Sequence, residues 1–282
     1  MARSPENDIT ELIASVRGSS KYGSISEAMI RSIGLRELAA RRNLKEAIKA
    51  TKNKLHQVAG AYLDGRLPYD DWLALLDEAR QADGVIDAGG SPTLHAQFRL
   101  ACRQIMRNHA STRERLPILE DFYAATLASL GQVSSVLDLA CGLNPLTLPW
   151  MPLAPDARYY ACDIYADMIA FLNGFFTRAG LEGQTEECAL AAGAPNVQVD
   201  LALVLKALPP LDQQAKHAGR DLLRALNARH ILVSFPAQSL GGRGKGMAEN
   251  YEQRFRTLAD SEGWAIERFV FPTELAFLVR KG

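Results

Sequence analysis

The sequence has no long apolar run. No stretch of about 18 consecutive apolar residues occurs, so no segment is predicted to span a membrane. The first residues, MARSPE, lack the apolar core of a secretory signal peptide. Hydrophobic residues make up 48% of the chain and charged residues 23%, which is ordinary for a globular protein in water. We therefore expect a cytoplasmic protein with no membrane partner.

Cysteine is scarce and scattered. The four cysteines, Cys102, Cys141, Cys162 and Cys188, form no C-x-x-C pair. Three of them lie in or beside apolar runs, where cysteine behaves as a small hydrophobic residue. Zinc sites and disulfide frameworks both depend on characteristic cysteine spacings. The sequence therefore predicts neither a metal site nor a disulfide framework.

The glycine motifs that cradle phosphates are also missing. Neither G-x-G-x-x-G nor G-x-x-x-x-G-K-[ST] occurs in the chain. A ligand that carries a pyrophosphate needs the anion cradle that those glycines build. Dinucleotides and nucleoside triphosphates are therefore not the expected ligands.

A strand and turn typical of a nucleoside site are nevertheless present at residues 136–145. An apolar run ends in Asp138, a turn with Gly142 follows, and Pro145 favours a helix start. Twenty-five residues after Asp138, a second apolar run ends in Asp163. The turn lets the backbone approach a ligand, and the carboxylate accepts hydrogen bonds from ribose hydroxyls. A ligand with a ribose but no phosphate fits best, and S-adenosylmethionine is the obvious one.

Helical periodicity fills residues 8–110, and strands alternate with helices from residue 133 onward. Helices are expected near 8–16, 24–41, 44–63, 69–81, 93–108, 111–130, 145–150, 165–179, 211–227 and 248–262. Strands are expected near 133–139, 158–163, 184–188, 199–205, 229–234, 264–271 and 274–280. The helix at 111–130 opens with Ser111 and Glu114 in a capping-box spacing. The last two strands are close enough for an antiparallel hairpin. The fold class is α/β, with a Rossmann-like seven-stranded methyltransferase sheet at 111–282 and an N-terminal all-helical domain at 1–110.

Charge is distributed unevenly although the net charge is zero. Residues 1–110 carry a net charge of +3 and the remainder −3. No acidic residue occurs between Ala88 and Arg113, and Arg99, Arg103 and Arg107 are spaced four apart within that gap. A spacing of four places them on one helix face. Such a face is either a solvated surface or a docking site for a polyanion such as RNA.

Several motifs together resemble one enzyme family. They are, in chain order, LHQVAGAY at 55–62, HASTRER at 109–115, DLACGLNP at 138–145, CDI at 162–164, DLALVLKALP at 200–209, SFP at 234–236 and SLGGRGKGM at 239–247. The sequence resembles the 16S ribosomal RNA methyltransferases that modify guanine N7 at position 1405 of the decoding site and confer aminoglycoside resistance. The HAST run and the glycine-rich run are the most specific parts of the match.

The resemblance implies a set of residues that bind S-adenosylmethionine. The matching positions are His109, Ala110, Ser111, Arg115, Ala140, Gly142, Asp163, Leu205 and Gln214. Arg115 is expected to pair with the methionine carboxylate, although a helix-surface ion pair with Glu114 or Glu120 is the alternative. Ala189 stands where the family commonly has an aspartate near the adenine. Backbone atoms of Ala189 and Leu190 are expected to serve there, and the alternative is that Glu187 takes the role after a small shift.

Three further cationic residues are assigned to the substrate. Lys206 follows an apolar strand and either caps the sheet edge or positions the substrate; we expect the second role, without a general base. Arg243 and Lys245 lie in the glycine-rich run and are expected to bind RNA, together with Arg99, Arg103 and Arg107. The alternative for that run is a solvated loop.

The resemblance also implies the reaction and the partner. Guanine N7 has a free lone pair, so its attack on the sulfonium methyl needs alignment and exclusion of water, not a base. The expected partner is 16S rRNA within the 30S subunit, and the expected state is a monomer. Three alternatives stay open at this point: methylation of adenine N1 in the decoding site, methylation of a small molecule, and binding of cofactor and RNA without catalysis.

Overall fold

The computed structural model describes residues 5–57, 67–84, 96–190, 193–237 and 246–281. Seven strands form one sheet in the order β3-β2-β1-β4-β5-β7-β6. Their bounds are β1 Val133–Leu139, β2 Leu153–Asp163, β3 Glu182–Glu187, β4 Val199–Leu205, β5 Ala228–Pro236, β6 Ala265–Val270 and β7 Glu274–Arg280. The first five strands run parallel, and β7 is antiparallel to both β5 and β6. The predicted methyltransferase-type sheet with its C-terminal hairpin is confirmed.

Helices precede the sheet and then alternate with its strands. Their bounds are α1 Pro5–Arg17, α2 Glu27–Ala40, α3 Leu44–Leu55, α4 Tyr69–Asp83, α5 Ala96–Met106, α6 Ala110–Arg115, α7 Leu119–Thr126, α8 Ala166–Ala179, α9 Leu208–Gln214, α10 Ala218–Ala225 and α11 Met247–Glu262, with 3-10 helices η2 Leu116–Ile118 and η3 Asn144–Trp150. None of the helices so described is long and apolar enough to cross a membrane.

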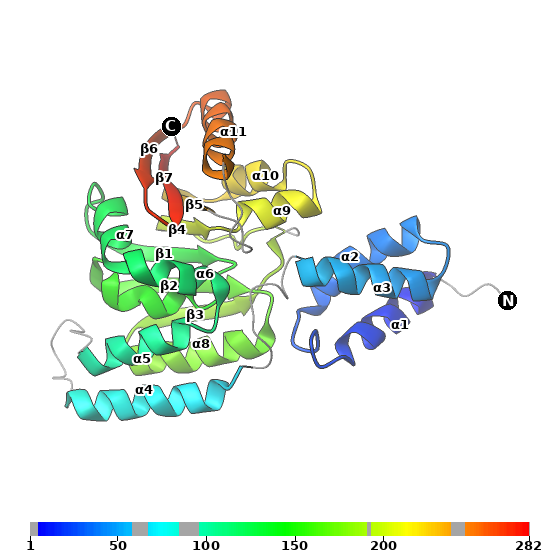
Figure 1. Cartoon of the computed structure of the whole chain (residues 1–282), viewed down its shortest axis with the longest axis horizontal. Helices are drawn as coiled ribbons and strands as arrows, with labels where there is room; N and C mark the ends of the chain where they lie inside the picture. Colours follow the sequence, from blue (N-terminus) through cyan, green and yellow to red (C-terminus); the bar gives the residue numbers. More distant parts are fainter. Residues whose placement is uncertain (1–4, 58–66, 85–95, 191–192, 238–245, 282) are drawn as a thin grey trace.

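Each face of the sheet has its own core. Successive strand residues point to opposite faces, so Leu203 joins the core with α8 whereas Val204 joins the core with α10 and α11. Figure 1 shows α8, α5 and α4 layered below the sheet and α9 to α11 above it. The alternation of apolar residues on β1 and β4 therefore fixes a three-layer arrangement, with the carboxyl ends of the parallel strands at one edge.

The N-terminal helices divide between two locations. Rings of Tyr69 and Trp72 on α4 contact Phe171 on α8, with centroids 5.3 and 5.5 Å apart. Helices α1 to α3 instead pack on one another, and a Cβ on Gly34 of α2 would lie 2.7 Å from Leu12 of α1. Figure 1 shows these three helices as a separate blue lobe beside the carboxyl edge of the sheet. We refer to α1–α3 as the N-terminal lobe.

Local helix predictions failed where tertiary contacts took over. Ser111 and Glu114 do not form a capping box, because α6 starts at Ala110 with His109 as its N-cap and has no side-chain cap bond. Glu114 pairs instead with Lys206 on the neighbouring strand end. The single helix expected at 111–130 is α6, η2 and α7, and the one expected at 211–227 is α9 and α10.

The cysteine prediction was also wrong. Cys162 and Cys188 form a disulfide, 26 residues apart in the sequence. Cys162 is the penultimate residue of β2, and Cys188 follows β3 directly; these two strands are parallel neighbours in register. Sheet pairing, which cysteine spacing does not reveal, brings the two thiols together. Cys102 and Cys141 are buried free thiols.

Candidate functional site

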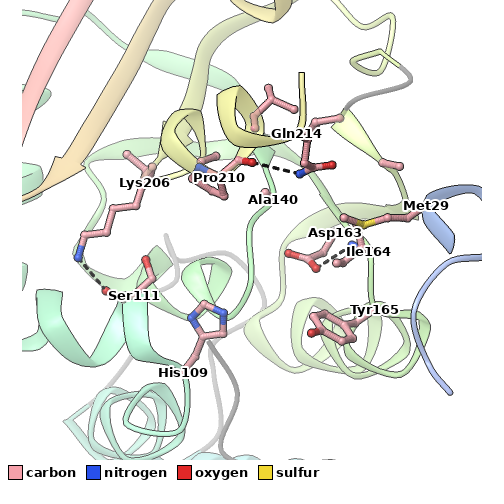
Figure 2. Close-up of a pocket in the computed structure, with 15 residues that line it drawn as sticks. Met29, His109, Ser111, Ala140, Asp163, Ile164, Tyr165, Lys206, Pro210 and Gln214 are labelled. Carbon is pink, nitrogen blue, oxygen red and sulfur yellow. Dashed lines mark hydrogen bonds between the residues drawn. The ribbon is translucent and has the colours of Figure 1, made fainter. Parts of the chain in front are cut away.

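A cavity opens at the carboxyl ends of β1, β2 and β4, where ligands of open α/β sheets bind. The empty space inside it, counted together with the open solvent at its mouth, is about 770 Å³. Figure 2 shows its lining side chains. They are Met29, His109, Ser111, Ala140, Asp163, Ile164, Tyr165, Ala189, Leu190, Leu205, Lys206, Ala207, Pro210, Leu211 and Gln214.

The turn after β1 forms one wall of this cavity. Ala140 has a φ of 49° and Gly142 a φ of 51°, both in the left-handed region. The backbone nitrogen of Cys141 donates to the carbonyl of Cys162 at 3.0 Å, which ties the turn to the end of β2. A Cβ on Gly142 would lie 2.7 Å from the ring of His109. Glycine is therefore required here for close packing as well as for backbone conformation.

Asp163 is the carboxylate at the tip of β2. Its side chain accepts from the backbone nitrogen of Gly142 at 2.8 Å and from that of Ile164 at 2.7 Å. Burial raises the pKa of this carboxyl, and the backbone donors oppose that rise. The backbone of Tyr165 is a third donor, and since a carboxylate accepts about four hydrogen bonds, about one acceptor site remains for a ligand. The side chain is thus oriented by the turn and remains able to accept from a ligand's hydroxyls.

Lys206 follows β4 and has a φ of 59°. Its ammonium nitrogen donates to Glu114 Oε2 at 2.7 Å and lies 3.3 Å from Glu274 Oε2 and 3.4 Å from the carbonyl of Ser111. Figure 2 shows the side chain extended toward Ser111 along one side of the cavity. The stem lines the cavity while the charged end joins α6 to the strand ends.

Arg115 does not reach the cavity. Its guanidinium donates to both carboxylate oxygens of Glu274, at 2.6 and 3.2 Å, and to Asn144 Oδ1 at 2.7 Å. Arg115 is 1% exposed and Glu274 is fully buried. Arg115 therefore forms a buried ion pair with Glu274 of β7, and not the helix-surface pair with Glu114 or Glu120 that was the alternative.

Beneath the cavity the polar network continues to Asp138. Asn144 Nδ2 and the hydroxyl of Tyr159 donate to its Oδ2 at 2.9 and 2.7 Å. Burial raises the pKa of Asp138 to about 7, against the stabilising hydrogen bonds. The network holds η3 and the turn after β1 against the sheet.

His109 is neutral at physiological pH. Burial, together with the nearby charges of Arg115, Lys206 and Arg113, lowers its pKa to about 4. An imidazole with that pKa neither donates a proton readily at pH 7 nor repels a cationic ligand.

The cavity brings together most of the residues assigned from the sequence. Those that line it are His109, Ser111, Ala140, Asp163, Ala189, Leu190, Leu205, Lys206 and Gln214. Ala110, Arg115 and Gly142 do not line it. Sequence reasoning missed Met29, Tyr165, Ala207, Pro210 and Leu211 as lining residues, and Ile164 was noted only as part of a motif. Tyr165, Ala207, Pro210 and Leu211 lie within a few residues of recognised positions, whereas nothing local in the sequence points to Met29.

The arginines assigned to RNA have different surroundings. Arg99 and Arg103 lie over the ring of Trp150, at 4.8 and 5.7 Å from its centroid. Arg103 also donates to Glu120 at 2.7 Å. Arg107 lies one residue beyond α5 and is exposed. Arg243 and Lys245 lie outside the described residues.

Comparisons with known proteins agree with this geometry. The chain is 37% identical to a 16S rRNA (guanine(1405)-N(7))-methyltransferase of Micromonospora echinospora, with 98% of each chain covered. It is 38% identical to an enzyme of the same name from Frankia casuarinae, covering 99% of this chain and 95% of the relative. The crystal structure of the 16S rRNA methyltransferase RmtF in complex with S-adenosyl-L-homocysteine matches with a TM-score of 0.82 at 26% identity, over the full length of both chains.

A family model spans nearly the whole chain as well. It is described as ribosomal RNA methyltransferase (FmrO) and matches residues 18–278. The match includes the turn after β1, Asp163 and the glycine-rich run. The chain therefore belongs to the FmrO family of ribosomal RNA methyltransferases.

Proposed function

We propose that this chain transfers a methyl group from S-adenosylmethionine to N7 of guanine 1405 of 16S rRNA in the 30S subunit, and thereby confers aminoglycoside resistance. The observation that carries the proposal is the cavity at the strand ends, with Asp163 held by backbone donors. Full-length relatives that carry the same enzyme name support it.

The lining suits the parts of this cofactor. Asp163 would accept from the ribose hydroxyls, and the apolar side chains of Ile164 and Leu190 would flank the adenine. Ser111 and Gln214 supply further polar atoms to the lining. Arg115 lies beneath the cavity, so its proposed contact with the methionine carboxylate requires that the guanidinium be shared with Glu274.

The residues of the site can align reactants without moving a proton. The bound cofactor supplies an electrophilic methyl group on a sulfonium. His109 is neutral and so does not repel the positively charged sulfonium. The charge of the Lys206 ammonium is balanced by Glu114 and Glu274. Because N7 attacks through its own lone pair, these residues need only orient the base and exclude water. Lys206 would then help to position the substrate in two ways. Its ion pair with Glu114 holds α6 in place, and its aliphatic chain lines the cavity.

We assign RNA docking to residues 1–110, together with Arg243 and Lys245. Arg107 is the most accessible of the three spaced arginines, whereas Arg103 is bound to Glu120. A triple substitution would therefore disturb packing on Trp150 as well as charge. The cleaner test is Arg107→Glu, with 30S affinity as the readout and cofactor affinity as the control. The proposal places the enzyme in the cytoplasm as a monomer.

The first experiment combines purified protein, 30S subunits and S-adenosylmethionine, followed by borohydride and aniline treatment of the rRNA and primer extension. Scission at guanine 1405 that depends on cofactor supports N7 methylation. A primer-extension stop at a neighbouring adenine in untreated rRNA would replace the proposal with adenine N1 chemistry. Naked 16S rRNA in a parallel reaction tests the requirement for the assembled subunit, and Asp163→Ala should abolish scission.

A further inference from the structure

Helix α2 of the N-terminal lobe forms part of the cavity wall. Met29, in the first turn of α2, lines the cavity and is 6% exposed. Within the described residues, every other lining residue belongs to the sheet domain or to the segment that leads into it. Figure 2 shows Met29 beside Ile164 and Asp163, entering from the lobe. A residue more than 100 positions from the strand ends therefore contributes to the site.

Backbone hydrogen bonds hold the start of α2 on the segment that follows Asp163. The nitrogen of Ser26 donates to the carbonyl of Ile164 at 2.7 Å, and the nitrogen of Ala166 donates to the carbonyl of Ser24 at 2.9 Å. Between them, Ile25 and Tyr165 form an antiparallel bridge. The lobe thus forms a short strand-like pairing with the residues directly after Asp163, the carboxylate expected to bind the ribose.

The helix cap then sets the position of Met29. Ser26 is the N-cap of α2, and its hydroxyl oxygen accepts from the backbone nitrogen of Met29 at 3.3 Å. Such a cap fixes the first turn of a helix relative to the preceding residue. Ser26 is also hydrogen-bonded to Ile164, which lines the cavity. The position of Met29 is therefore fixed relative to the cavity wall.

A second contact joins α2 to the end of α9. Arg36 Nη1 donates to the carbonyl of Gln214 at 2.7 Å, and Gln214 ends α9 and lines the cavity. Met29 and Arg36 are seven residues apart, which is about 10 Å along a helix. Helix α2 therefore connects the Asp163 side of the cavity to the α9 side.

We propose that Met29 is a cofactor-contacting residue and that α2 couples cofactor occupancy to the docking of the N-terminal lobe on the sheet domain. This inference rests on the proposed cofactor of the cavity. The flexible thioether of Met29 packs against the bound nucleoside. A ligand that contacts both the lobe and the strand ends stabilises their docked arrangement, and by linkage the docked arrangement raises ligand affinity.

The test is the affinity for S-adenosylhomocysteine, measured by titration calorimetry on the full chain. Met29→Ala is expected to lower affinity about five- to tenfold, which corresponds to roughly 1–1.4 kcal/mol. Met29→Leu, which keeps the size and apolar character, should stay within about twofold. Leu35→Ala is the matched control, since Leu35 is a half-exposed apolar residue of the same helix that does not line the cavity.

Amide hydrogen exchange supplies the second readout. S-adenosylhomocysteine should slow exchange at Ser26 and Ala166, whose amides cross between lobe and sheet domain, and should do so less in Met29→Ala. Unchanged affinity in Met29→Ala, or an equal loss in Leu35→Ala, would overturn the inference. A wild-type chain that binds no S-adenosylhomocysteine would contradict the proposed function itself.

Discussion

Glu274 is the buried charge on which the site's polar network depends. It faces the guanidinium of Arg115 at 2.6 Å and the ammonium of Lys206 at 3.3 Å, and it is fully buried. Glu274→Gln removes the only charge in this group that binds both cations, while the side chain keeps its size. Arg115 then stays in a dry interior without its counter-ion. Breaking a buried pair from one side costs about 3–5 kcal/mol, a large part of the usual total stability of about 5–15 kcal/mol.

The assay is urea denaturation at pH 7, with unfolding monitored by tryptophan fluorescence. The matched control is Glu182→Gln, because Glu182 pairs with Arg158 at 3.4 Å and both side chains are more than half exposed. That exposed pair should contribute no more than about 0.5 kcal/mol. If Glu274→Gln and Glu182→Gln were equally stable, the buried network would not support the fold as argued.

The pH dependence gives an independent check on the same pair. Burial favours the neutral form of Glu274, but Arg115 and Lys206 outweigh it and hold the pKa below its usual 4.5. A lowered folded-state pKa contributes stability above the unfolded pKa, and this contribution is lost as pH falls through the folded pKa. The stability gap between wild type and Glu274→Gln should therefore be full at pH 7 and shrink below about pH 4. A gap that widens on acidification would contradict the assignment.

Two further predictions concern the cavity walls. Gly142→Ala places a Cβ 2.7 Å from the ring of His109 and should lower methylation of 30S subunits roughly ten- to a hundredfold. Gly131→Ala is the control, because Gly131 has open space around it and its variant should keep full activity. Equal activities of the two variants would refute the close-packing argument. Cys188→Ser should lower stability by about 3.5 kcal/mol, the chain-entropy value for a loop of 26 residues. Dithiothreitol should bring the wild-type unfolding midpoint to that of the variant and leave the variant unchanged, and a wild-type midpoint insensitive to reductant would contradict the disulfide's role.

The sequence predicted what depends on neighbours along the chain. The turn at 138–145 and the carboxylate at Asp163 were recognisable because each directly follows an apolar strand. The succession of strands and helices along the chain followed from the alternating pattern. The remaining cofactor positions came from family resemblance. Glu274 was not predicted, because its partner Arg115 lies 159 positions away and nothing in the local pattern of β7 marks a buried carboxylate. The capping box at Ser111 failed for the same reason, since Lys206 binds Glu114 from another element.

The arginines of α5 show why the cofactor site was easier to predict than the RNA surface. Their spacing implies a shared helix face, although Arg107 lies one residue beyond α5, and spacing does not say what that face meets. In the fold Arg99 and Arg103 lie over Trp150, and Glu120 accepts from Arg103, so part of the charge is used within the protein. A cofactor site at strand ends is assembled mainly from short runs that each follow one strand, and such runs can be recognised one at a time in the sequence. An RNA-docking surface consists of the charged side chains that stay exposed after the helices have packed. Only the folded structure shows which side chains those are.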